Sequence, residues 1–89
     1  MLTREGEVLK VAGPMNIGSA AALLAQSDGL LADVRVVDLS DVTEVDSAAV
    51  SLLLEWRRQD KSSTLRFANL PAALNSLAAL YGVTDLIPQ

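Results

Sequence analysis

The residues best placed for chemistry are a hydroxyl and the carboxylate before it, in the segment from 34 to 58. Ser47 follows Asp46 and precedes an apolar run that only a helix accommodates. The first N–H groups of a helix lack partners within the helix, and the helix dipole makes this end positive. A small hydroxyl there suits an anion site, a phosphorylation site or a contact with a partner protein. The purely structural alternative is capping of the helix by Asp46 or Ser47, which contributes roughly 1 kcal/mol.

Two large apolar residues, Leu52 and Trp56, lie one turn apart on the helix expected from residue 47 to about residue 60. Both fall at the flank of this helix, beside its polar stripe. One interpretation places them in the periphery of the core. The other places them in an exposed apolar rim around Ser47 that docks on another protein, because Trp is over-represented at interface hot spots. The rim hypothesis makes both residues predicted partner contacts. The full predicted set is Asp46, Ser47, Ala48, Ala49, Leu52 and Trp56.

Several carboxylates flank the same position and could suggest a metal site. They are Asp38, Asp41, Glu44 and Asp46. Hard cations bind groups of carboxylates, but this spacing lacks the glycine and the distal glutamate of a calcium loop. The sequence therefore favours a solvated acidic loop, and we predict neither a metal site nor a cofactor.

The composition excludes several classes of activity. The chain of 89 residues has no cysteine and no histidine, which removes disulfides, thiolate nucleophiles, Cys/His zinc sites and Ser-His-Asp triads. General-base work would fall to a carboxylate, and no two acids form an obvious buried pair. The net charge of −4 argues against binding to nucleic acid or anionic lipid, since both need clustered cations. We therefore expect a non-enzymatic protein.

The hydropathy pattern shows no signal peptide and no apolar run near the roughly 20 residues that a membrane span needs. The expectation is a reduced, cytoplasmic protein that does not insert into the membrane directly. At 89 residues the chain is predicted to form one domain over 1–89, with a modest core built from Leu, Val and Ala.

The elements that must position these residues follow from the pattern of apolar, glycine and proline positions. The N-terminus reads as a hairpin of strands 2–4 and 7–12, with the second strand ended by Gly13-Pro14. Asn16 is the expected N-cap of a helix over 19–31, in which Asp28-Gly29 marks the end or a late kink. The segment 34–39 is the expected central strand, buried on both faces, and a polar bend over 40–46 leads to the helix that Ser47 begins.

The C-terminal half continues the alternation. The expected elements are a turn at 61–63, a strand over 64–68, a helix that starts at 69–71 and stops at Gly82, and a short edge strand over 85–87. The order ββαβαβα predicts an α/β fold with a mixed, mostly parallel sheet of four or five strands and three helices. If the helices lie largely on one face, the result is a two-layer sandwich.

The central segment also resembles a known family. Asp38-Leu-Ser, an acidic spacer, then Val45-Asp-Ser47, two small residues and Val50 are similar to the signature of STAS domains. These are the anti-sigma-factor-antagonist domains, found also on sulfate transporters. The resemblance independently implies the two-layer fold. In the antagonist branch it aligns Ser47 with a serine that a partner kinase phosphorylates, so it makes Ser47 the main candidate for a regulated or partner-contacting hydroxyl.

The C-terminal residues resemble one branch of this family more specifically. The run from Leu77 to Pro88 is similar to the C-terminal end of MlaB-type STAS subunits of bacterial Mla phospholipid ABC transporters. That likeness implies a subunit at the inner membrane that binds a cytosolic MlaF-like ATPase and supports phospholipid transport and outer-membrane lipid asymmetry. The alternative is an anti-sigma-factor antagonist, with an anti-sigma-factor kinase as partner. Ala48 and Ala49 replace the glycine or serine usual in the family, which favours the transporter branch, and their small size still lets a partner approach.

Overall fold

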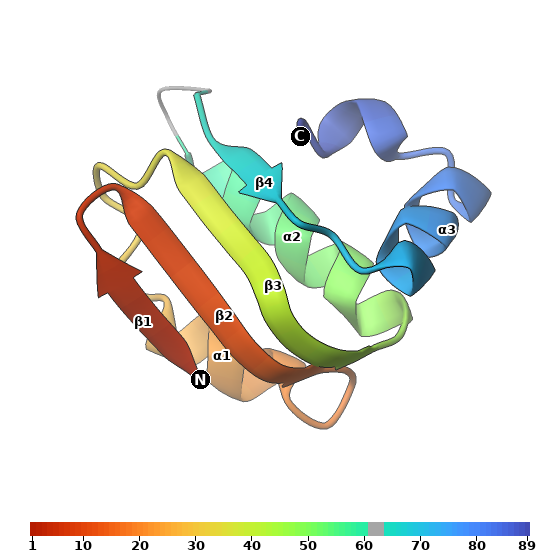
Figure 1. Ribbon diagram of the computed structural model, residues 1–89, viewed down its shortest axis with the longest axis horizontal. Coiled ribbons are helices and arrows are strands. Elements are labelled where there is room, and N and C mark those ends of the chain that lie inside the picture. Colours follow the sequence, from red (N-terminus) through yellow and green to blue (C-terminus); the bar gives the residue numbers. More distant parts are fainter. Residues whose placement is uncertain (61–63) are drawn as a thin grey trace.

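The computed structural model describes residues 1–60 and 64–89, and the order of its elements is the expected one (Figure 1). The elements are β1 (Leu2–Glu5), β2 (Val8–Met15), α1 (Ala20–Gln26), β3 (Val36–Val45), α2 (Ser47–Gln59), β4 (Arg66–Ala68), α3 (Ala72–Leu80) and the 3-10 helix η1 (Thr84–Leu86). The turn predicted at 61–63 lies outside the described residues.

The strands form one sheet in the order β1-β2-β3-β4. β1 pairs with β2 antiparallel, and the pairs β2/β3 and β3/β4 are parallel. Figure 1 shows α1 and α2 behind one face of this sheet, with α3 beside α2 beyond β4. The predicted two-layer α/β sandwich, with three α-helices and a mixed, mostly parallel sheet, is confirmed.

The core lies between the covered face of the sheet and the helices. Alternate residues of the strands point into it, namely Leu9 and Val11 of β2, Val37 and Leu39 of β3, and Phe67 of β4. Val36 and Asp38 of β3 point the other way and are only half-buried. The prediction that the central strand is buried on both faces is therefore wrong, because all the helices that cover the sheet lie on one side.

β2 and β3 are longer than the sequence predicted. Both strands continue through the segments expected to be a strand end and a polar bend, and they pair up to Met15 and Val45. The ladder is irregular there, with a register shift between Gly13 and Pro14 and a φ of 88° at Gly13. A proline is tolerated at such an irregularity because its missing N–H interrupts no regular ladder bond.

The ends of several elements also differ from prediction. α1 is shorter than 19–31, and the chain leaves it through Gly29, whose φ of 79° suits only glycine without strain. β4 is shorter than 64–68. The edge strand expected over 85–87 is instead η1, although the carbonyl of Pro88 accepts a hydrogen bond of 2.8 Å from the N–H of Phe67 in β4. Gly82, at a φ of 69°, follows α3 as predicted.

Asp38, on the open face of β3, makes the fold sensitive to pH. Its Oδ1 accepts hydrogen bonds of 3.0 Å from the side-chain amide of Asn69 and from the N–H of Ser40. These bonds lower the pKa of the Asp38 carboxyl. A carboxyl whose pKa is lower folded than unfolded stabilises the fold above its unfolded pKa of about 4, and that contribution disappears as the pH falls through the lower, folded pKa.

We therefore expect Asp38→Asn to lower the free energy of unfolding at neutral pH. The effect should diminish as the pH falls from about 4, the unfolded pKa, through the lower pKa of the folded carboxyl. Urea unfolding of the two proteins across this range measures the difference directly. A difference that stays constant from neutral to acidic pH would mean that the ionised carboxylate has no special role.

Candidate functional site

The candidate site lies where β3 ends and α2 begins, and Asp46 organises it. Its Oδ1 accepts a hydrogen bond of 2.8 Å from the N–H of Ala48, which makes Asp46 the N-cap of α2. Its Oδ2 accepts a second bond, of 3.0 Å, from the N–H of Ile17 in the loop between β2 and α1. One carboxylate thus joins two segments that are far apart in the sequence and meet at one end of the sheet (Figure 1).

Ser47 is the first residue of α2, as predicted, and is exposed. Since Asp46 supplies the cap, the Ser47 hydroxyl is not needed for that purpose. Within residues 1–60 and 64–89 no hydrogen bond engages this hydroxyl. It stands at the positive end of a helix of 13 residues. The hydroxyl is therefore open to a partner group or to a phosphoryl group.

The loop between β2 and α1 is held by a small network of polar groups. Asn16 Oδ1 accepts bonds of 3.0 and 3.1 Å from the N–H groups of Gly18 and Ser19. The Ser19 hydroxyl accepts a bond from the N–H of Asn16 and donates one of 2.7 Å to the carbonyl of Pro14. Asn16 therefore caps this turn rather than α1, which begins only at Ala20, so the predicted role of Asn16 as the N-cap of that helix is corrected.

An open groove of about 550 Å³ runs between α1 and α2, beside this loop. Its lining residues are Ile17, Ala20, Ala21, Leu24, Ser47, Ala48, Ser51, Leu52 and Glu55. Small side chains dominate, so a partner's backbone could approach closely. At the far end of the groove the Glu55 carboxylate accepts a bond of 2.9 Å from Nε of Arg58, and hydrogen bonding to Arg58 lowers the pKa of Glu55.

The exposed rim predicted for Leu52 and Trp56 does not exist. Trp56 is 0% exposed, and its indole Nε1 donates a bond of 2.9 Å to the hydroxyl of the buried Ser27. Leu52 is 4% exposed and reaches only the floor of the groove. Ala49 is fully buried as well. Among the predicted contacts, only Asp46, Ser47 and Ala48 lie at or near the surface, since α2 turns a broader apolar face inward than its polar stripe suggested.

The sequence pattern did not indicate the α1 side of the groove, above all Ile17, which is 85% exposed. Ile17, Ala21 and Leu24 are spaced as on one helix face, and an apolar run of this kind is normally assigned to the core. Their exposure becomes apparent only once α1 is known to begin after Ile17 and to bury Leu23 instead.

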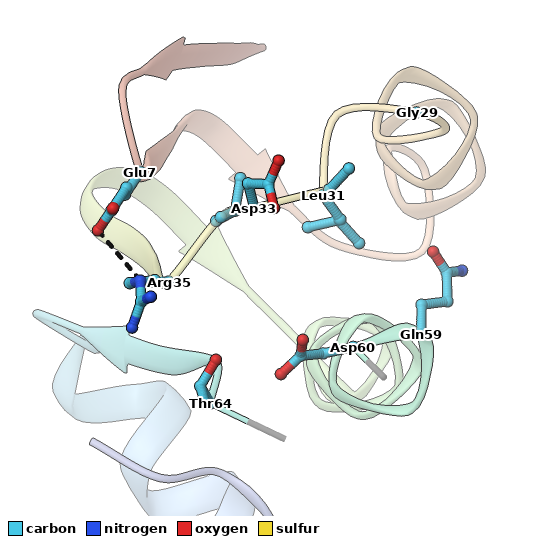
Figure 2. A pocket seen from close by; sticks show the side chains of 10 residues that line it. Glu7, Gly29, Leu31, Asp33, Arg35, Gln59, Asp60 and Thr64 are labelled. Atoms are coloured by element: carbon cyan, nitrogen blue, oxygen red, sulfur yellow. Dashed lines mark ion pairs between the residues drawn. The ribbon is translucent and has the colours of Figure 1, made fainter. Parts of the chain in front are cut away.

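A second hollow, of about 630 Å³, opens at the opposite end of the sheet, and Figure 2 shows its lining. Glu7, Asp33 and Arg35 surround it, and Nε of Arg35 lies 3.3 Å from a carboxylate oxygen of Glu7. Asp60 also lines this hollow, so three carboxylates and one guanidinium face it. Over residues 1–60 and 64–89 no three His, Cys, Asp or Glu side chains gather as a metal site would require.

The bridging carboxylate of Asp46 should be worth a measurable part of the stability. We expect Asp46→Ala to lower the free energy of unfolding by about 1–2 kcal/mol, the upper range for an N-cap, because the bond to Ile17 is lost with it. Asp46→Asn keeps an oxygen acceptor and should cost less. Urea unfolding of both variants checks the order. Equal stability of Asp46→Ala and wild type would contradict the bridging role.

Comparison with solved structures assigns the fold to a class. The anti-sigma factor antagonist SpoIIAA in its unphosphorylated form superposes with a TM-score of 0.69 at 16% identity, over 98% of this chain and 84% of that one. The crystal structure of Mglu matches with a TM-score of 0.56 at 26% identity, over 81% of this chain but only 19% of Mglu. The fold is therefore that of a STAS-type α/β domain.

The family is identified by sequence. Residues 1–88 match the family described as Mlab, STAS domain, and the chain belongs to it. No curated protein sequence matches the chain significantly. Within the described part of the chain, no helix has the length and apolar character needed to cross a membrane.

Proposed function

We propose that this STAS domain is a non-enzymatic subunit that binds the cytosolic ATPase of an Mla-type ABC transporter and supports its assembly or its ATP hydrolysis. Membership of the Mlab STAS family is the ground for choosing this partner. In this role the chain is cytoplasmic, is held at the inner membrane through the ATPase, and contributes to phospholipid transport and outer-membrane lipid asymmetry.

The observation that carries the proposal is the exposed Ser47 hydroxyl, which makes no hydrogen bond within the described residues and stands at the head of the α1/α2 groove. An exposed hydroxyl beside a mainly apolar groove supplies the elements of a protein–protein contact with a polar anchor. The groove is open, and among the described residues that line it only Glu55 is titratable, so no pair of groups there suits acid–base chemistry. This favours binding over catalysis.

A second candidate is a phosphorylation switch of the anti-sigma-factor-antagonist kind. The same exposure of Ser47 favours it, because a kinase needs an accessible hydroxyl. A phosphoryl group would add nearly two negative charges beside Asp46 and would alter any surface that includes the groove. The likeness to SpoIIAA is one of fold, at 16% identity, so it does not favour this candidate over the first.

Co-expression tests the first candidate. The tagged chain is expressed with the untagged ABC ATPase of its own genome, and the complex is isolated by affinity and gel filtration. We expect a stable complex of defined stoichiometry. The contradicting result has two parts: no complex forms, and Ser47 carries stoichiometric phosphate after incubation of the chain with ATP and a cell extract. That result would reject the transporter role in favour of the phosphorylation switch.

A further inference from the structure

We propose that Ile17 is the apolar anchor of the docking surface, and that the occupant of the α1/α2 groove is a basic amphipathic segment of the ATPase: an apolar side chain flanked by Lys or Arg. This inference rests on the proposed function. It adds the chemistry of the partner segment and the residue that receives it.

The first observation is that Ile17 is exposed yet its backbone is held in place. The side chain is 85% exposed at the mouth of the groove. Its N–H is bound by Asp46 Oδ2, and the next two N–H groups are bound by Asn16 Oδ1. A Cβ added at Gly18 would lie 3.3 Å from this same Asn16 oxygen, so the Asn16 side chain lies close against the turn.

Such an arrangement favours binding. A flexible loop would have to be ordered when a partner docks, and that ordering opposes association. Here the loop is already ordered by bonds within the fold. When a partner covers the exposed isoleucine, the hydrophobic free energy of burying its side chain contributes to binding, as it does for central apolar residues of interfaces. Leu24, the other large exposed residue in the groove, extends the apolar strip along α1.

The second observation is the charge around the groove. The segment 11–34 contains no Lys or Arg, and neither does the segment 36–56, which carries five carboxylates. Glu55 is neutralised by Arg58, but at the Ser47 end Glu44 and Asp46 meet only neutral donors within the described residues. The two carboxylates flank this end of the groove, and their formal charges outweigh the partial positive charge of the α2 N-terminus. The net charge there is negative, and a segment with Lys or Arg beside its apolar residue is complementary to it.

The test measures the affinity of the full chain for the ATPase by calorimetry, with two variants and one control. Ile17→Ser should weaken binding tenfold or more while leaving the thermal midpoint of the isolated chain unchanged, because the side chain packs against little in the fold. Leu80→Ser removes a side chain that is similarly exposed, at 76%, but lies on α3 away from the groove. It should bind like wild type.

Salt provides the second readout. Wild-type affinity should fall several-fold between about 50 and 300 mM NaCl, since the Debye length shortens over this range, and Glu44→Gln should make the fall smaller. Wild-type binding that is unaffected by Ile17→Ser or by salt would overturn this inference and leave the proposed function standing. Failure of the wild-type chain to bind the ATPase would overturn both. A self-association of the isolated chain that Ile17→Ser abolishes would assign the groove to a second copy and would also overturn the inference.

Discussion

Trp56→Ala is expected to destabilise the domain by about 3–5 kcal/mol, the upper range for truncation of a single core side chain to alanine. The indole is fully buried and is the largest side chain of the core. Its removal leaves a cavity and also takes the Nε1 donor from the Ser27 hydroxyl, which is only 1% exposed. A small domain has about 5–15 kcal/mol of stability in total, so the variant should be marginally folded.

Urea unfolding followed by circular dichroism measures this effect, since the variant lacks the tryptophan that fluorescence would report. Trp56→Phe is the matched control. It keeps most of the volume and loses the donor, so the expected cost is only about 1–2 kcal/mol. Arg57→Ala, at the exposed neighbouring position, should stay within about 0.5 kcal/mol of wild type. If Trp56→Ala unfolded at the same urea concentration as wild type, the indole would not be a core residue and the rim hypothesis would return.

Ser47→Asp is expected to have the largest effect on binding. In the proposed interface the partner covers the hydroxyl, and the cations of its basic segment face Glu44 and Asp46. A further carboxylate buried at position 47 is therefore not compensated and costs several kcal/mol. The adjacent carboxylate of Asp46 adds repulsion. Ser47→Thr keeps the hydroxyl and adds one methyl group to a side chain that is exposed in the isolated domain, so its affinity for the ATPase should stay close to that of wild type.

Calorimetric titration of the ATPase with the three proteins gives the comparison, and the thermal midpoints of the isolated domains serve as the folding control. Both variants should fold normally, because a carboxylate in the first turn of α2 is compatible with the helix dipole. Wild-type affinity of Ser47→Asp would show that position 47 lies outside the interface. Loss of binding by Ser47→Thr as well would point to a closer steric fit than the open groove suggests.

The sequence predicted the order of elements and the start of α2 because these depend on local signals. A β-branched run before Asp38 is typical of a strand. The Asp46-Ser47 pair is typical of a helix start, and Gly82 is typical of the left-handed turn that ends a helix. The extension of β2 and β3 could not be predicted in this way. The local sequence predicts that the strands end at Gly13-Pro14 and at the acidic run 40–46. Both segments are extended in the structure because β2 and β3 pair with each other there.

The candidate site was predicted in part for the same reason. Ser47 and its capping neighbour are fixed by local sequence, and both lie where they were expected. The sides of the groove depend on how α1 packs against α2, which no local pattern contains. Helical periodicity predicts that Leu52 and Trp56 lie at the edge of the buried face of α2. In the structure Trp56 is fully buried, where its indole contacts Ser27 of the segment after α1. For Ile17 the difference is the opposite one. Its apolar side chain is exposed instead of buried, because α1 begins three residues after it.

The affinity of Ser47→Ala for the ATPase tests the central claim most directly. This variant removes only the hydroxyl, and alanine is well tolerated in the first turn of a helix. If the hydroxyl is a hydrogen-bonding contact with the ATPase, calorimetry should show a loss of tenfold or more in affinity, which corresponds to about 1.4 kcal/mol. Wild-type affinity of Ser47→Ala, combined with loss of regulation in cells, would contradict the transporter account and identify Ser47 as a phosphorylation switch.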